Sequence, residues 1–165
     1  MATTIPVPIE FSLPEGWVSA PPDEVGAPEA AFVALRPSAA NGFTPNITIA
    51  GEVRTDDVPL SVVADEAAEK LERATGQVQV GRRSEVGTPD NPGFTQAVRT
   101  RIKVGGQPLD VVQLQVFLGM ADVQDPDRRA VLHIALTSKP DQFESVVGDF
   151  QKFLKTIRPE QGDKS

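Results

Sequence analysis

The 165-residue sequence contains no cysteine and only one histidine, His133. Without cysteine the chain cannot form disulfides, thiolate nucleophiles, cysteine-ligated zinc sites or iron–sulfur clusters. A single histidine excludes a metal site built on several imidazoles. The sequence also lacks tyrosine, and most of its eight phenylalanines fall at positions typical of a core. A platform of exposed aromatics that stacks nucleic-acid bases is therefore not expected.

Basic residues and long hydrophobic runs are also scarce. Lys and Arg total 16 against 23 Asp and Glu, which gives a net charge of −7. A field of this sign disfavours nucleic acid, because binding to phosphates needs a basic surface. No apolar run approaches the ~20 residues of a membrane-spanning helix, and residues 1–16 lack the features of a signal peptide. We expect a cytoplasmic protein with no cofactor, no nucleic-acid partner and no membrane insertion.

What is present is typical of one folded domain. The length suits a single domain, and 39% of the residues are hydrophobic, as in a globular chain. Hydrophobic periodicity predicts short strands at 9–13 and 17–18 and longer strands at 30–36, 46–53, 78–86, 94–104, 109–119 and 129–137. We expect one domain over 1–165, with a core over about 7–159 and a flexible tail at 160–165.

Two amphipathic helices complete the predicted order β-β-β-β-α-β-β-β-β-α. The first begins near Leu60 and is capped at Gly76, and the second runs from about Pro140 to Ile157 with Ser138 as its predicted cap. Short hairpins, one of them at Gly105-Gly106, connect the last four strands into an antiparallel meander. The fold class is therefore α+β, with a central antiparallel sheet of about six to eight strands packed by two main helices. We expect both helices on the same side of this sheet.

Alternation along the strands separates a predicted core face from a far face. Leu114, Val116, Leu132 and Ile134 belong to the core face, and the set that includes Phe94 and Val98 is assigned to the same side. The far face then forms the candidate interaction face, which consists of Arg99, Arg101, Gln113, Gln115, Phe117 and His133. Two interpretations stay open: a solvated face partly covered by the N-terminal segment, or a surface that binds a partner or ligand.

Patterns that support catalysis or metal binding are weak. His133 lies in the middle of a predicted strand, and no nucleophile-elbow motif accompanies it. Asp122, Asp125 and Asp127 share one loop, and such carboxylates can bind a hard cation. Their spacing is not that of a calcium loop, and two arginines follow them directly. We therefore expect an ordinary polar loop, no metal site and no catalytic residues.

Several segments resemble the actinobacterial LpqN/LpqT family, which belongs to the PsbP-like fold group. They are the opening PVPIEFSLPEGW, then AFVAL, GFTPNITI and the terminal FQKFLKTIRP. The F-x-[LY]-P-x-G-W opening of PsbP-like domains is matched over Phe11–Trp17. The resemblance covers residues 7–159 and implies a non-enzymatic domain with a central antiparallel sheet. In PsbP-like relatives, helices can lie on both faces of this sheet, which is the alternative to helices on one side. Its relatives include photosystem accessory factors, a binder of a small GTPase and chaperones of secreted proteins, and named LpqN members are lipoproteins. This sequence has no lipid-accepting cysteine, and the family supplies no functional residues to transfer.

These observations favour a non-catalytic accessory or protein-interaction module with an unknown protein partner, acting as a monomer or homodimer. The alternative is a module that binds a small molecule or lipid in a cavity between sheet and helices. A hydrolase or transferase is the weaker alternative.

Overall fold

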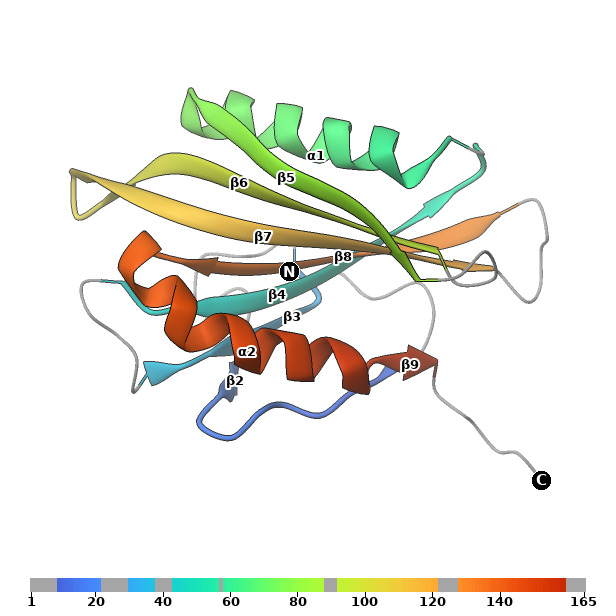
Figure 1. The fold of residues 1–165 in the computed structure, drawn as a ribbon, viewed down its shortest axis with the longest axis horizontal. Coiled ribbons are helices and arrows are strands. Elements are labelled where there is room, and N and C mark those ends of the chain that lie inside the picture. Colours follow the sequence, from blue (N-terminus) through green and yellow to red (C-terminus); the bar gives the residue numbers. More distant parts are fainter. Residues whose placement is uncertain are drawn as a thin grey trace.

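Two helices lie on opposite faces of a seven-stranded antiparallel sheet (Figure 1). The computed structural model describes residues 9–21, 30–37, 43–56, 58–87, 92–121 and 128–159. The elements are β1 (Ile9–Glu10), β2 (Val18–Ala20), β3 (Phe32–Leu35), β4 (Asn46–Arg54), α1 (Leu60–Thr75), β5 (Val78–Gly87), β6 (Pro92–Val104), β7 (Gln107–Ala121), β8 (Arg129–Ser138), α2 (Pro140–Thr156) and β9 (Arg158–Pro159).

The sheet has the order β2-β3-β4-β8-β7-β6-β5, and every neighbouring pair is antiparallel. The predicted α+β class and the predicted meander over the last four sheet strands are confirmed. Gly105 and Gly106 have φ of +58° and +81°, which is the conformation that a two-residue type I′ hairpin requires and glycine tolerates. This turn pairs Val104 with Gln107 and thereby sets the register of β6 against β7. The short β1 pairs with β9 outside the main sheet.

Helix α1 forms where the sequence predicts it. Pro59 precedes its first turn, and Gly76 ends it in the left-handed conformation with φ of +91°. Leu60, Val63 and Ala64 are its buried residues, and they share one side at the spacing of a helical turn. They pack in one cluster with the sheet residues Phe94, Phe117 and Val131.

Helix α2 covers the other face, mainly over β7 and β8. Its buried Val146, Phe150 and Phe153 pack against strand residues of the larger core cluster. The helix starts at Pro140 as expected, but Lys139 rather than Ser138 is its N-cap residue. The side chain of Gln142 accepts a 2.9 Å hydrogen bond from the Lys139 backbone N–H, whereas Ser138 is the last residue of β8.

The prediction that both helices cover one side of the sheet is wrong. Leu132 and Ile134 of β8 belong to the α2 cluster, while Val131, which directly precedes Leu132, belongs to the α1 cluster. Neighbouring residues of a strand point to opposite faces, so β8 carries a core on each side. The middle strands carry buried apolar residues on both faces, such as Phe117 under α1 and Val116 under α2, because a helix covers each face.

The resemblance motif attaches the N-terminal segment to α2. Phe11 packs edge-on against Phe153 at 5.3 Å between ring centroids. The indole N–H of Trp17 donates a 3.0 Å hydrogen bond to Asp149, and Gly16 makes the turn before it with φ of +91°. Across the described ranges, no helix combines the length and apolarity that crossing a membrane requires.

Candidate functional site

The structure divides the predicted interaction face between the two sides of the sheet. Paired residues in an antiparallel sheet place their side chains on the same face. Gln113 is opposite Val98, whereas Arg99 is opposite Val112, so Gln113 and Arg99 point to opposite sides. The single face predicted from the sequence is therefore wrong. Gln113, Gln115, Phe117 and His133 lie on the α1 side, and Arg99 and Arg101 lie on the α2 side.

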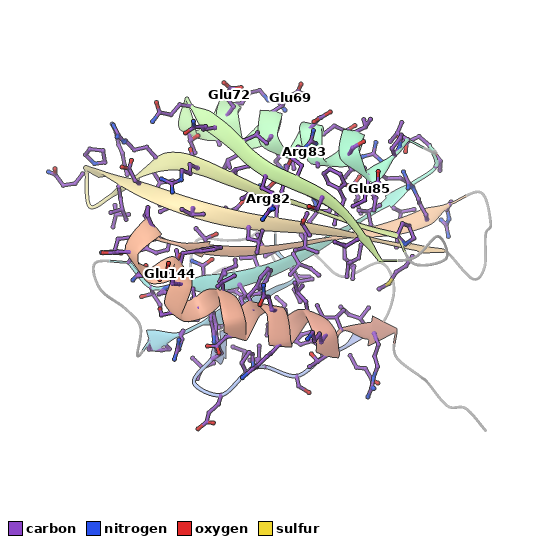
Figure 2. All side chains as sticks on the ribbon, in the orientation of Figure 1. Glu69, Glu72, Arg82, Arg83, Glu85 and Glu144 are labelled. Carbon is purple, nitrogen blue, oxygen red and sulfur yellow. The ribbon has the colours of Figure 1, made fainter. Side chains whose placement is uncertain are left out.

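On the α2 side, the helix packs over β7 and β8, and β5 and β6 extend beyond it (Figure 1). We call five exposed polar residues of this part the basic half-face; they are Gln79, Arg82, Arg99, Arg101 and Lys103. A β-bulge between Val80 and Arg83 shifts the register of β5. Figure 2 shows the consequence: Arg83 points toward α1, and Arg82 points to the other side of β5.

The cations of the basic half-face are mostly unneutralised. Arg101 forms an exposed ion pair with Asp110, at 2.8 Å between Nε and the carboxylate. That carboxylate raises the pKa of Arg101. Within the described ranges, Arg82, Arg99 and Lys103 have no ion pair or hydrogen bond through their side chains. The surface therefore carries net positive charge on a chain whose total charge is −7.

Arg101 also lies where the surface is hollowed. A depression of about 410 Å³ is lined by Arg99, Arg101, Asp110 and Pro140, the first residue of α2, among others. Arg101 contributes to two further depressions of about 620 and 600 Å³, one beside the start of α2 and one beside the end of α1. The two arginines of the prediction thus stay together, at an uneven surface that another chain can contact.

On the α1 side, a groove of about 650 Å³ runs between the helix and strands β4, β7 and β8. Its sheet side is formed by Ala50, Glu52, Gln113, Gln115 and His133. Its helix side is formed by Val63, Glu66, Ala67, Glu69, Lys70, Leu71, Arg73 and Ala74. Three of the six predicted residues therefore lie together here, away from the two arginines.

The floor of the groove is part of a row of side-chain amides. Gln96 donates to the Gln115 oxygen at 2.7 Å, Gln115 donates to Gln113 at 2.6 Å, and Gln113 donates to the Thr137 hydroxyl at 3.0 Å. Gln96 also donates to the Ala64 carbonyl of α1. Because Gln96 is only 1% exposed, these bonds satisfy an otherwise costly buried amide.

His133 lies at the sheet side of the groove. Its Nε2 atom is 2.7 Å from a Glu52 carboxylate oxygen, but it has no hydrogen bond of good geometry among the described residues. Burial lowers the pKa of His133 below its ordinary value of 6.5, against the opposing effect of Glu52. The imidazole is thus mostly neutral at neutral pH.

Phe117 is not a surface residue. It is 1% exposed, packs in the α1 cluster, and meets the His133 ring edge-on at 5.1 Å between centroids. It contributes to stability and holds the imidazole in place, but a partner cannot reach it.

Sequence reasoning missed a cluster of charges where β4 leads into α1. Arg54 binds the carboxylates of Glu52, Asp56 and Glu66 at 2.9, 2.7 and 2.7 Å. These contacts raise the pKa of Arg54 and lower the pKa values of Asp56 and Glu66. The alternation Glu52-x-Arg54-x-Asp56, which places all three on one side of an extended chain, was the available signal. The cluster fixes the connection between strand and helix.

The described residues contain neither a catalytic pair at His133 nor a cluster of metal-binding side chains. No hydrogen bond among the described residues joins His133 to a serine or threonine hydroxyl, as a nucleophile and base would require. In the same ranges, no three His, Asp or Glu side chains are grouped to hold a metal. The predicted loop carboxylates Asp122, Asp125 and Asp127 lie outside the described residues.

Comparison with known proteins supports the fold and nothing narrower. Neither a protein-family model nor a curated protein sequence matches the chain. Solved structures of several proteins are similar to it. LpqN, involved in cell envelope biogenesis of Mycobacterium tuberculosis, has a TM-score of 0.61 at 16% identity. The match covers 93% of this chain and 86% of the LpqN chain.

Cyanobacterial PsbP (CyanoP) from Synechocystis has a TM-score of 0.62 at 13% identity, with coverage of 92% and 86%. The Saccharomyces cerevisiae Ran-binding protein Mog1p has a TM-score of 0.59 at 15% identity, with coverage of 92% and 89%. The chain therefore has a PsbP-like fold. The narrower resemblance to the LpqN family stays a prediction.

Proposed function

We propose that this chain is a non-catalytic protein-interaction module that docks an acidic segment of a partner protein on its basic half-face. The observation that carries the proposal is the local reversal of charge. Arg82, Arg99 and Lys103 have no carboxylate partner in the described ranges, and only Arg101 does, whereas the whole chain is acidic. Complementary charge speeds encounter and selects the partner.

The surroundings of these cations suit a polypeptide better than a nucleic acid. Half-buried Ala97 and Leu114 lie on the same side of the sheet as Arg99, so a partner finds apolar area inside a polar rim. A nucleic acid would meet the overall charge of −7 around a small basic area. An acidic segment with apolar side chains fits both features.

The similar structures agree with this proposal only at the level of fold. Mog1p is a Ran-binding protein, so a chain of this fold can present a protein-binding surface. Fold alone does not carry function from one protein to another, and the proposal therefore rests on the charges and not on the likeness. The cytoplasmic location and the choice between monomer and homodimer stay predictions.

The test removes two cations from the basic half-face and compares the loss with a matched removal elsewhere. One variant is Arg99→Gln with Arg101→Gln. The control is Lys152→Gln with Lys155→Gln, which lowers the charge equally on the exposed side of α2. Both pairs are exposed, so the variants should fold. Each bait is used to capture proteins from a lysate, and captured proteins are quantified by mass spectrometry at two salt concentrations.

We expect the wild type and the lysine control to capture a partner that carries an acidic segment, and the arginine variant to lose it. The amount captured should fall as the salt concentration rises. Capture that is equal for both variants, or a partner whose binding segment is not acidic, would contradict the proposal.

A further inference from the structure

The apolar stripe of α1 is buried along only half of its length. Leu60, Val63 and Ala64 are its buried residues. The later members of the stripe, Leu71 and Ala74, line the 650 Å³ groove instead of a closed core. An apolar helix wall that faces an open groove leaves room for a ligand, and the volume lies in the range of about 300–1,000 Å³ usual for small-molecule sites.

The floor opposite this wall offers both donors and acceptors. A glutamine amide can donate two hydrogen bonds and accept two. Gln113 and Gln115 each donate one and accept one within the amide row, so each keeps capacity for another bond of either kind. Both side chains line the groove. A ligand group that itself pairs a donor with an acceptor, as a carboxamide does, matches such a floor.

We propose that the groove beside α1 binds a small uncharged molecule that carries a carboxamide or a similar donor–acceptor pair next to an apolar body. The polar part contacts Gln113 and Gln115, and the apolar part lies against Ala67, Leu71 and Ala74. This site is separate from the basic half-face, which lies on the other side of the sheet, and it does not depend on the proposed protein partner.

The charges around the groove favour an uncharged ligand. Three carboxylates, those of Glu52, Glu66 and Glu69, and two cations, those of Lys70 and Arg73, contribute to its lining. They nearly balance, so neither an anion nor a cation is strongly attracted. An acyl chain fits poorly as well, because it would desolvate the two amides without forming hydrogen bonds with them.

Three probes that share one ring isolate the amide contribution: benzamide, benzoate and toluene. Each is titrated into ¹⁵N-labelled full-length protein, and the side-chain NH₂ signals of Gln113 and Gln115 are followed. We expect benzamide to shift both signals in a saturable way and to bind roughly tenfold more tightly than benzoate or toluene, as one or two added hydrogen bonds imply.

Two variants fill the groove, and one matched variant does not. Ala67→Phe places a ring in the groove, and Ala74→Phe does the same from an exposed position, which keeps the test valid if the first variant fails to fold. Ala68→Phe adds the same ring one residue away, outside the groove lining. We expect benzamide binding to weaken at least several-fold in the groove variants and to persist in Ala68→Phe.

The inference is overturned if benzoate or toluene binds there as tightly as benzamide. It is equally overturned if the glutamine signals do not move, or if a folded groove variant binds benzamide as the wild type does.

Discussion

Replacing Phe117 with alanine tests the assignment of the two sheet faces. On the single far face predicted from the sequence, Phe117 would be a partly exposed residue beside Arg99. In the structure it is 1% exposed and packs under α1 with Leu60, Val63 and Phe94. The two assignments predict very different costs for removing the ring.

The expected cost follows from full burial. Transfer of a buried phenylalanine side chain to water accounts for about 1.5–3 kcal/mol, and the cavity that remains adds to it. Phe→Ala substitutions in cores typically cost about 3–5 kcal/mol. An exposed position would change the free energy of unfolding by no more than about 0.5 kcal/mol. For a domain of this size, the larger cost lowers Tm by about 6–20 °C.

Urea denaturation followed by circular dichroism measures this difference directly. Val104→Ala is the control, because Val104 is 42% exposed near the end of β6 and should change stability little. A loss below about 1 kcal/mol for Phe117→Ala would refute the placement of α1 over this part of the sheet.

Three further predictions concern single contacts. Because burial lowers the pKa of His133 below 6.5, the unfolded chain binds the proton first as pH falls. The stability that the neutral imidazole contributes is present above about pH 6.5 and is lost as pH falls through the folded-state pKa. The free energy of unfolding in urea should therefore fall more between pH 7.5 and 5 for the wild type than for His133→Gln. An equal fall in both proteins would contradict this. Trp17→Phe removes the hydrogen bond to Asp149 and should cost about 1–2 kcal/mol in thermal unfolding, whereas an unchanged Tm would show that the bond contributes nothing. Gly76→Ala introduces a side chain at φ of +91° and should destabilise α1 by about 1 kcal/mol, measured as faster amide exchange in its last turn; unchanged exchange would argue against the left-handed cap.

The elements of this fold could be predicted closely, because each depends on local sequence. Alternation and helical spacing placed α1 and α2 to within one or two residues, and Gly76 and Gly105-Gly106 marked a cap and a turn that the structure contains. The short β9 was missed, since two residues at the end of a helix carry no periodic signal. Its pairing with β1 joins residues far apart in the sequence.

The error in the candidate site arose from register and not from the assignment of strands. Phe94 and Val98 were placed with Leu114 on the assumption that all apolar sets serve one core. A two-residue turn at Gly105-Gly106 instead pairs Val104 with Gln107, and counting back from it puts Val98 opposite Gln113. The turn was recognised in the sequence, so this register was available there. The groove and the unpaired cations could not be predicted, because they depend on how far each helix extends across its face.

The measurement closest to the central claim is the position of the surface that an acidic peptide contacts. A synthetic peptide of alternating glutamate and leucine is titrated into ¹⁵N-labelled protein at low salt, and backbone amide shifts are mapped onto the sheet. We expect shifts along β5 and β6 at Gln79, Arg99 and Arg101, and we expect these shifts to be lost in the double variant Arg99→Gln with Arg101→Gln. Shifts confined to the α1 side around Gln113 and His133, or no shifts at all, would contradict it.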